Sequence, residues 1–156
     1  MKYIIFDVDG VLADSSGREQ KYLIGKEKEE VNWDLFYKDA DKDKPILSGI
    51  LTARALFYHG KYELIFLTGR NESVKEKTLD WLSYNLMLDK SVINLIMRPD
   101  ENNDNNSKFK ETIGKKLGFE NIVLAFDDNK KTVDMWRSHG VKCFHTDERN
   151  FKQNNY

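Results

Sequence analysis

Short apolar runs recur along this sequence, and an amphipathic segment of helical length lies between each run and the next. The runs are rich in β-branched and aromatic residues, as is typical of buried strands, and lie at residues 1–6, 64–67, 92–97, 122–126 and 141–144. Strands that alternate with helices in this way predict an α/β fold with a mostly parallel sheet flanked by helices.

Start and stop signals bound the first two expected helices. We expect Pro45 at the first helical position and Gly60 at the end, because proline suits a helix start and glycine a helix stop. Apolar residues within 46–57 have the spacing of one buried helix face. Ser73 and Glu76 have the spacing of a capping box, which predicts the start of the second helix.

A polar loop at residues 99–107 separates the third expected strand from the third helix. Asn106 or Ser107 is expected to cap that helix, since either side chain can accept a hydrogen bond from a free backbone amide. The fourth helix should end at Gly140, and the polar tail of residues 147–156 should fray.

Residues 15–44 are rich in charge and show little apolar periodicity. Trp33, Phe36 and Tyr37 interrupt them as one aromatic-rich group. The segment fits either a solvated loop with a hydrophobic anchor or a small flap over a site. We favour the flap, because long loops in compact domains are usually functional. The segment is too short to form a large cap domain.

Length and composition narrow the class of protein. The 156 residues suit a single domain over residues 1–156, and the net charge of −1 argues against purely electrostatic binding to long nucleic acid. The single cysteine, Cys143, excludes an internal disulfide and a cysteine-cluster metal site. The sequence has no apolar stretch of membrane-spanning length and no secretory leader, so we expect a cytoplasmic protein without membrane contact.

Three of the expected strands finish in polar side chains. These are Asp7 and Asp9, Thr68, and Asp127 and Asp128. The carboxyl ends of parallel strands meet at one edge of a sheet, where such sheets bind ligands. Asp7 and Asp9 share a face of an extended chain, and two like charges so close are costly unless a cation compensates them. The sequence therefore predicts a charged binding site at this edge.

This set of side chains suits phosphoryl transfer. Carboxylates without imidazole or thiolate predict a hard divalent cation, and Mg²⁺ is the natural choice because it leaves room for a phosphate oxygen. The Thr68 hydroxyl can donate to a second phosphate oxygen, and Lys108 or Lys110 near a helix start can neutralise a third. One aspartate can attack phosphorus, while a second carboxylate protonates the leaving oxygen and then activates water.

Four motifs in order along the chain resemble those of the haloacid dehalogenase superfamily. They are Asp7-x-Asp9-Gly10, Thr68-Gly69-Arg70, a helix-borne lysine and Asp127-Asp128. The resemblance implies a Rossmann-like fold and phosphatase chemistry, with Asp7 as the nucleophile and Asp9 as the general acid/base. It also implies that Mg²⁺ is held by the Asp7 carboxylate, the Asp9 backbone carbonyl and one of the acidic pair Asp127 and Asp128, of which we favour Asp128.

A narrower resemblance is to the 3′-phosphatase domain of phage-type polynucleotide kinases. It rests on residues 127–143, Gly17-Arg18, residues 33–36, residues 43–45 and Met97-Arg98-Pro99. It implies that Lys110, rather than Lys108, is the motif lysine. Arg18 and Arg70 are either ordinary surface residues or contacts to the substrate phosphate, and we favour the contacts because guanidinium suits phosphate. The backbone amide of Gly69 can also donate to the substrate phosphate.

The chain departs from that narrower pattern at two places. Asp104-Asn105-Asn106 stands where the family carries Arg-Pro-Asp, and Asn129 stands where it carries an arginine. Neither change touches the expected nucleophile or metal ligands. Both positions are candidates for substrate contacts, so the changes bear on the preference for nucleic acid.

Three functions fit these observations. The first is a Mg²⁺-dependent phosphomonoesterase that acts through an aspartyl-phosphate on the 3′-phosphate of a polynucleotide end. The second is a monophosphatase of free (deoxy)nucleotides. The third is a module that binds a phosphate or a partner without turnover, which the complete motif set disfavours. We favour the first, because without a large lid the site should stay open to a long substrate.

Overall fold

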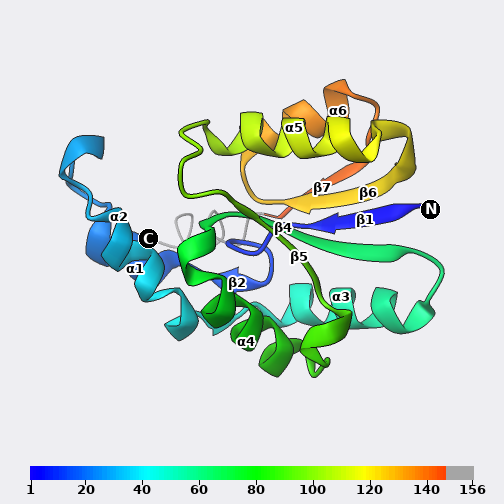
Figure 1. Cartoon of the computed structure of the whole chain (residues 1–156), viewed down its shortest axis with the longest axis horizontal. Helices are drawn as coiled ribbons and strands as arrows, with labels where there is room; N and C mark the ends of the chain where they lie inside the picture. The colour runs from blue at the N-terminus through cyan, green and yellow to red at the C-terminus, as the bar shows by residue number, and fades with distance from the viewer. Residues whose placement is uncertain (147–156) are drawn as a thin grey trace, which may run out of the picture.

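The computed structural model describes residues 1–146, in which five strands form one parallel sheet (Figure 1). The strands are β1 (Tyr3–Phe6), β4 (Glu63–Asn71), β5 (Asn94–Arg98), β6 (Ile122–Asp127) and β7 (Cys143–His145). They lie in the order β5-β4-β1-β6-β7, and each neighbouring pair is parallel. The prediction of a mostly parallel sheet flanked by helices is confirmed.

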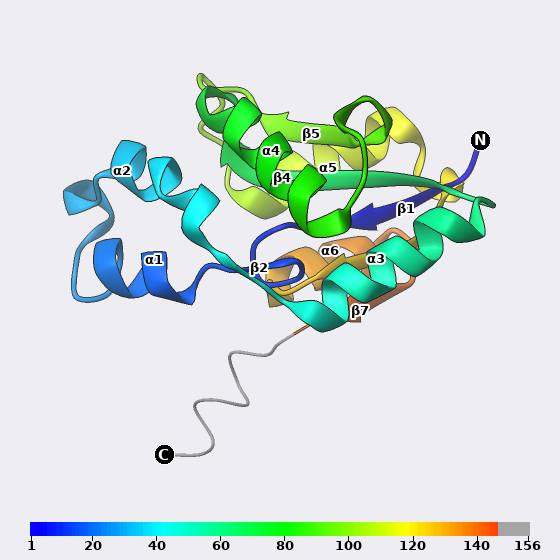
Figure 2. The same cartoon turned by 90° about the horizontal axis from the view of Figure 1, so that it is seen from below.

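Helices cover both faces of the sheet. α3 (Leu47–His59) and α4 (Lys75–Leu86) lie on one face, and α5 (Asn106–Leu117) and α6 (Lys130–Ser138) lie on the other (Figures 1 and 2). Successive side chains of β1 point to opposite faces, so Ile4 and Phe6 join the core with α3 and α4, whereas Ile5 joins the core with α5 and α6. Burial on both faces explains why the strands are continuous apolar runs.

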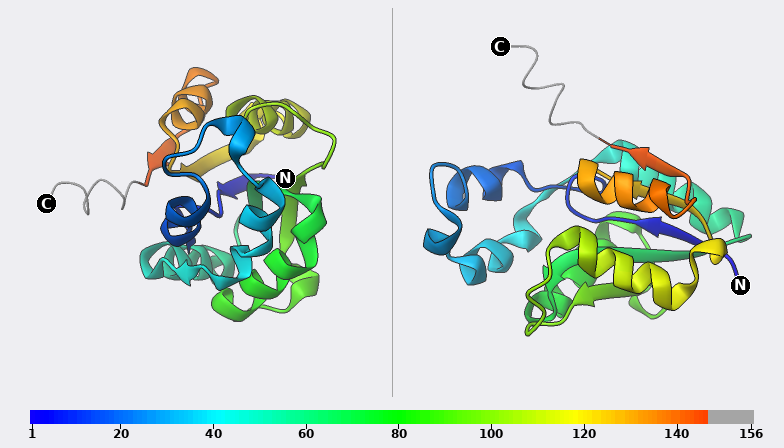
Figure 3. Two further views of the ribbon diagram at one scale, coloured as in Figure 1. Left: turned by 90° about the vertical axis from the view of Figure 1, so that its left-hand side faces the viewer. Right: turned by 90° about the horizontal axis from the view of Figure 1, so that it is seen from above.

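Residues 15–44, called the insert below, project beyond the carboxyl ends of the strands (Figures 2 and 3). The insert contains α1 (Ser16–Tyr22), α2 (Trp33–Lys38) and short 3₁₀ turns at Lys28–Glu30 and Ala40–Lys42. The antiparallel pair β2 (Ala13–Asp14) and β3 (Lys44–Pro45) lies at its base.

The aromatic group of the insert anchors it to the rest of the fold. Tyr22, Phe36 and Tyr37 form a small buried cluster with Val74, which lies just before α4, and with Met97, which lies in β5. The insert is therefore a small packed flap, built from short helices instead of an irregular loop.

The start of α3 differs from the prediction. Pro45 lies in β3, and the helix begins two residues later, at Leu47. The amide of Ile46 donates to the carbonyl of Leu12 at 2.7 Å, which holds this stretch extended beside the turn after β1. The predicted end at Gly60 is correct, since Gly60 follows the helix with a φ of +71°.

The capping box predicted at Ser73 and Glu76 is wrong. Ser73 lies in a 3₁₀ turn (Glu72–Val74), and its amide donates to Oδ1 of Asp100 at 3.1 Å. α4 begins at Lys75, after that turn. A contact with a distant loop therefore replaces the local cap.

The cap of α5 is one residue earlier than predicted. Oδ1 of Asn105, instead of Asn106 or Ser107, accepts the backbone amide of Lys108 at 2.9 Å. β5 and β7 begin two residues later than the apolar runs that predict them. The predicted polar tail, residues 147–156, lies outside the described residues. Within residues 1–146, every helix falls short of the length and apolar character needed to cross a membrane.

Candidate active site

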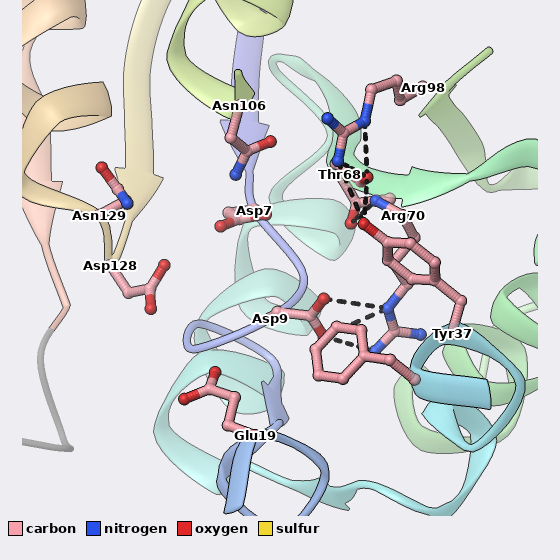
Figure 4. A pocket seen from close by; sticks show the side chains of 12 residues that line it. Asp7, Asp9, Glu19, Tyr37, Thr68, Arg70, Arg98, Asn106, Asp128 and Asn129 are labelled. Carbon is pink, nitrogen blue, oxygen red and sulfur yellow. Dashed lines mark hydrogen bonds and ion pairs between the residues drawn. The ribbon is translucent and has the colours of Figure 1, made fainter. Parts of the chain in front are cut away.

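The carboxyl ends of β1, β4 and β6 border a small pocket of about 210 Å³ (Figure 4). Asp7 directly follows β1, Thr68 lies in β4, and Asp128 directly follows β6. All three line the pocket, together with Asp9 and Arg70. The structure therefore brings together polar side chains that lie at three separate strand ends in the sequence.

The turn after β1 depends on Gly10. Its φ of +81° lies in the left-handed region, and its amide donates to the carbonyl of Ala13 at 2.8 Å. A Cβ at Gly10 would collide with the carboxylate of Asp128. Glycine at this position thus lets the carboxylate of Asp128 approach the turn that follows Asp7 and Asp9.

Lys110, from α5, is buried behind the pocket. Its Nζ lies 3.0 Å from Oδ1 of Asp7 and 2.6 Å from Oδ2 of Asp127. Burial disfavours the charged ammonium, but the carboxylates of Asp127 and Asp7 outweigh burial and raise the pKa of Lys110. Lys110 is therefore a charged anchor for Asp7.

The pKa of Asp7 is also raised, although Lys110 lies beside it. Burial is the largest cause, the Lys110 ammonium opposes it, and the charges of Asp127 and Asp9 add to the rise. Burial is the main cause of the rise at Asp7, whereas neighbouring carboxylates cause the rise at Lys110, and the buried cluster contains more carboxylates than cations. An additional cation near Asp7 would remove the excess and favour the ionised form.

The acidic cluster has the composition of a site for a divalent cation. Asp7, Asp127 and Asp128 each place a carboxylate oxygen within 4.8 Å of the others. Buried like charges are costly unless a cation compensates them, and an all-oxygen donor set suits a hard ion such as Mg²⁺. These side chains therefore fit the predicted metal. The role of the Asp9 carbonyl as a ligand stays a prediction.

Two arginines hold Asp9 at the side of the pocket, and Figure 4 shows one of them, Arg70. Its Oδ1 lies 2.6 Å from Nη2 of Arg70 and 2.9 Å from Nη2 of Arg18. Burial alone would raise the pKa of Asp9, but the guanidinium charges of Arg70 and Arg18 outweigh burial and lower it. Asp9 is therefore ionised before substrate binds, and its carboxylate is fixed in direction.

Asp43, from the insert, completes this ion-pair network. Its Oδ2 accepts from Nη2 of Arg18 at 2.7 Å and from Nη2 of Arg70 at 3.2 Å. Its carbonyl accepts from Nε1 of Trp81 at 2.9 Å, which ties the network to α4. Two carboxylates and two guanidinium groups thus balance each other. The network links the insert to the turn after β1.

Arg18 contacts the protein through all three guanidinium nitrogens. Nε and Nη2 donate to Asp43, Nη2 also donates to Asp9, and Nη1 donates to the carbonyl of Phe36 at 3.2 Å. Only 4% of Arg18 is exposed. Direct contact between Arg18 and the substrate phosphate stays a prediction, while its observed contacts fit a residue that positions Asp9.

We expect Arg18→Ala to lower kcat roughly 10- to 100-fold, because loss of alignment at the reacting centre has effects of this size. If Arg18 acts through Asp9, a 3′-phosphorylated oligonucleotide and a nucleoside 3′-monophosphate, which share one kind of leaving group, should be affected by similar factors in steady-state assays. Lys21→Ala, on the exposed side of α1, is the control. A loss confined to the oligonucleotide would instead show a direct contact with the substrate strand.

The segment Thr68-Gly69-Arg70 forms a bulge in β4. Thr68 pairs with Met97 and Asn71 with Arg98, so Gly69 and Arg70 have no partner in the ladder. Bulges redirect side chains next to active sites, and this one turns Arg70 toward Asp9. The position of Arg70 beside the pocket is therefore a consequence of the backbone.

Thr68 and Gly69 line one side of the pocket. Oγ1 of Thr68 accepts the amide of Arg70 at 3.2 Å, which leaves its own hydroxyl hydrogen able to donate. The carbonyl of Gly69 accepts from Nη2 of Arg98 at 2.6 Å, which fixes the peptide. A Cβ at Gly69 would collide with the side chain of Asn106, so glycine is needed for this approach.

Several residues of the site were not predicted from the sequence. They include Asp43, which binds both arginines, and Glu19, Tyr37 and Arg98, which line the pocket, whereas Asn106, also in the lining, lies in a stretch predicted as a candidate for substrate contacts. Oδ1 of Asn106 is buried without a hydrogen-bond partner among residues 1–146. The sequence signal for Asn106 was its place within Asp104-Asn105-Asn106, where the chain departs from the narrower family pattern.

A family model described as the polynucleotide kinase PNKP phosphatase domain matches residues 1–151 of the chain. The match spans nearly the whole sequence, including the four motifs described above.

Solved structures show the same fold at low sequence identity. A chain of the Pnkp1/Rnl/Hen1 RNA repair complex has a TM-score of 0.67 and 22% identity, covering 94% of this chain and 42% of that one. The present chain thus spans less than half the length of that protein. A haloacid dehalogenase-like hydrolase from Streptococcus pneumoniae has a TM-score of 0.64 and 15% identity, covering 99% of this chain and 90% of that one.

Proposed function

The chain belongs to the family of PNKP phosphatase domains and is a haloacid dehalogenase-like phosphatase, and we propose that it removes the 3′-phosphate from a polynucleotide end. The observation that carries the proposal is the set of charged side chains around Asp7 in the pocket. Lys110 holds one of its oxygens, Asp128 lies across from it, and Asp9 is fixed two residues further along.

In the first step we propose that an Asp7 oxygen attacks phosphorus and forms an aspartyl-phosphate. The bond from phosphorus to the ester oxygen breaks, and Asp9 gives that oxygen a proton. Asp9 is ionised in the free site, so this role requires it to take up a proton as the negative phosphate enters beside it. Thr68 and the backbone amides after it would donate to the phosphoryl oxygens.

In the second step water attacks the aspartyl-phosphate. Asp9 accepts a proton from this water, phosphate leaves, and Asp7 is restored. The two arginines keep the Asp9 carboxylate in one orientation through both steps. The pocket is open to solvent at Asp9, whose side chain is 27% exposed, so water can reach the intermediate.

Mg²⁺ would be held by Asp7 and Asp128, with the Asp9 carbonyl and Asp127 as further candidates. When bound, it supplies positive charge that offsets the negative charge of the phosphate in the transition state. Lys110 would keep Asp7 and Asp127 apart and correctly oriented around the ion. The excess of carboxylates in the buried cluster supports this assignment.

The deciding experiment compares three substrates under one set of conditions. They are a 3′-phosphorylated oligonucleotide, free nucleoside monophosphates and a generic aryl phosphate. We expect the highest kcat/KM for the oligonucleotide, because the small insert leaves the pocket open. Much faster cleavage of free nucleotides would assign the chain as a nucleotidase. Absence of turnover on all three would favour a binding module.

Removal of metal should abolish phosphate release without unfolding the protein. The cores that hold the sheet consist of apolar side chains, which bind no metal, so chelation by EDTA should leave the circular dichroism spectrum unchanged. Added Mg²⁺ should restore activity. Restoration by Zn²⁺ but not by Mg²⁺ would contradict the all-oxygen site.

A further inference from the structure

A second groove of about 370 Å³ lies next to the active-site pocket. The two share Tyr37 and Arg98 as lining residues. The other lining residues include Trp33 of the insert and the asparagines Asn71, Asn102 and Asn103. Its volume is within the range of sites that bind small organic groups. A ligand held at Asp7 can therefore extend into this groove.

Trp33 offers an aromatic surface to the groove. Its ring packs edge-on against Phe36, with centroids 5.7 Å apart, and lies 6.1 Å from the ring of Tyr37. Trp33 is 38% exposed, whereas Trp81 and Trp136 are 6% and 0% exposed. Trp33 is thus packed against two aromatic rings and remains partly open to solvent. This is the arrangement of an aromatic residue on which a base can stack.

The amides opposite offer hydrogen bonds of both kinds. The side chains of Asn71 and Asn103 make no hydrogen bond to another residue within 1–146, whereas Oδ1 of Asn102 accepts the amide of Asp104 at 2.9 Å. An unpaired primary amide has two donors and an acceptor, which match the polar edge of a nucleobase. The groove therefore combines an aromatic surface with polar groups at its edge.

The charges of the groove balance. Lys28 and Arg98 contribute positive charge, while Asp100 and Asp104 contribute negative charge. A second phosphate would gain little from such a lining, whereas a neutral base is compatible with it.

Arg98 joins this groove rigidly to the active site. Nε and Nη2 donate to the carbonyl of Gly69 at 3.0 and 2.6 Å, and Nη1 donates to the carbonyl of Asp104 at 2.9 Å. Nη2 also contacts the hydroxyl of Tyr37 at 3.2 Å. The Arg98 side chain thus connects the polar loop at residues 99–107, the insert and Gly69. The groove is formed before any ligand enters.

We propose that this groove binds the base of the nucleoside that carries the scissile phosphate, with Trp33 stacking on the base and the asparagine amides on its edge. The inference rests on the proposed function, since it requires a nucleotide at Asp7. It adds that the enzyme recognises the terminal base in addition to the phosphate. A substrate with the same sugar and phosphate but without the base should lose this recognition.

The test uses two oligonucleotides that differ only in whether the 3′-phosphorylated terminal residue carries a base. Trp33→Ala should lower kcat/KM about tenfold for the intact substrate, the usual scale of one base stacked on an aromatic ring. It should change kcat/KM for the abasic substrate by less than about twofold. Leu35→Ala, exposed on the same helix but outside the groove, is the matched control. Trp33→Phe should recover part of the loss.

Equal losses on both substrates, or none on either, would overturn the groove assignment and leave the phosphatase proposal intact. Intrinsic fluorescence provides a measurement that needs no turnover. An oligonucleotide should quench the exposed Trp33 in the wild-type protein more strongly than its abasic counterpart, and Trp33→Ala should remove that difference. If wild-type protein hydrolyses neither oligonucleotide, the proposed function fails. Fluorescence then still reports whether the groove binds a base.

Discussion

Asp7→Asn should abolish turnover, lowering kcat by roughly 10⁴-fold or more, the scale on which loss of a covalent nucleophile acts. The amide has nearly the shape of the carboxylate but cannot attack phosphorus. Lys110 keeps Asp127 as a partner at 2.6 Å, so the buried ammonium is not left alone. We therefore expect a folded, inactive protein. Phosphate release and the thermal midpoint, measured on the same preparation, check both parts.

Asp134→Asn provides the control for this change. Asp134 lies on α6, pairs with Lys130 at 2.6 Å and is 55% exposed in its side chain, so the same substitution there should leave activity unchanged. Acid quenching followed by mass spectrometry should detect a phosphorylated wild-type protein and no adduct on Asp7→Asn. Wild-type activity from a folded Asp7→Asn protein would refute the covalent mechanism.

The strands of this fold could be predicted because each is a buried apolar run. β1 and β6 have side chains that pack on both faces, so hydrophobicity alone marks them along the sequence. Helix starts were less predictable, since they depend on distant partners. The carbonyl of Leu12 holds Ile46 extended, and Asp100 binds the amide of Ser73. No local pattern encodes either contact.

The insert could not be predicted in detail for a related reason. α1 and α2 have seven and six residues, and helices this short are not stable alone in water. They are held by tertiary contacts, chiefly the packing of Tyr22, Phe36 and Tyr37 against Val74 and Met97. The aromatic residues were visible in the sequence, but their partners were not.

At the site, too, features encoded in local sequence could be predicted, whereas features that depend on distant contacts could not. The carboxylates at the ends of β1 and β6 were expected to meet, because parallel strands end at one edge, and their oxygens do lie close together. The ion-pair network was not expected. Asp9, Arg18, Asp43 and Arg70 are separated by up to 61 positions along the chain, and their charges are common in surface segments. Only the folded insert brings Asp43 to the two arginines.

That network sets the consequence of changing Asp9. Asp9→Asn should lower kcat by about 10²- to 10⁴-fold, the usual contribution of general acid–base catalysis. The asparagine can still accept hydrogen bonds from Arg70 and Arg18, and Asp43 remains to balance part of their charge. The loss of stability, measured as the thermal midpoint, should therefore be small beside the loss of activity.

Leaving-group dependence separates a catalytic loss at Asp9 from a structural one. A nucleoside hydroxyl is a poor leaving group and needs a proton, whereas an acidic phenol leaves with little help. In single-turnover measurements Asp9→Asn should therefore slow cleavage of a nucleoside 3′-phosphate much more than cleavage of an aryl phosphate. Arg18→Ala retains the carboxylate but loosens its alignment, so it should show the same dependence on the leaving group in weaker form. Equal slowing of both substrates by Asp9→Asn would mean that Asp9 supports the site without transferring the proton.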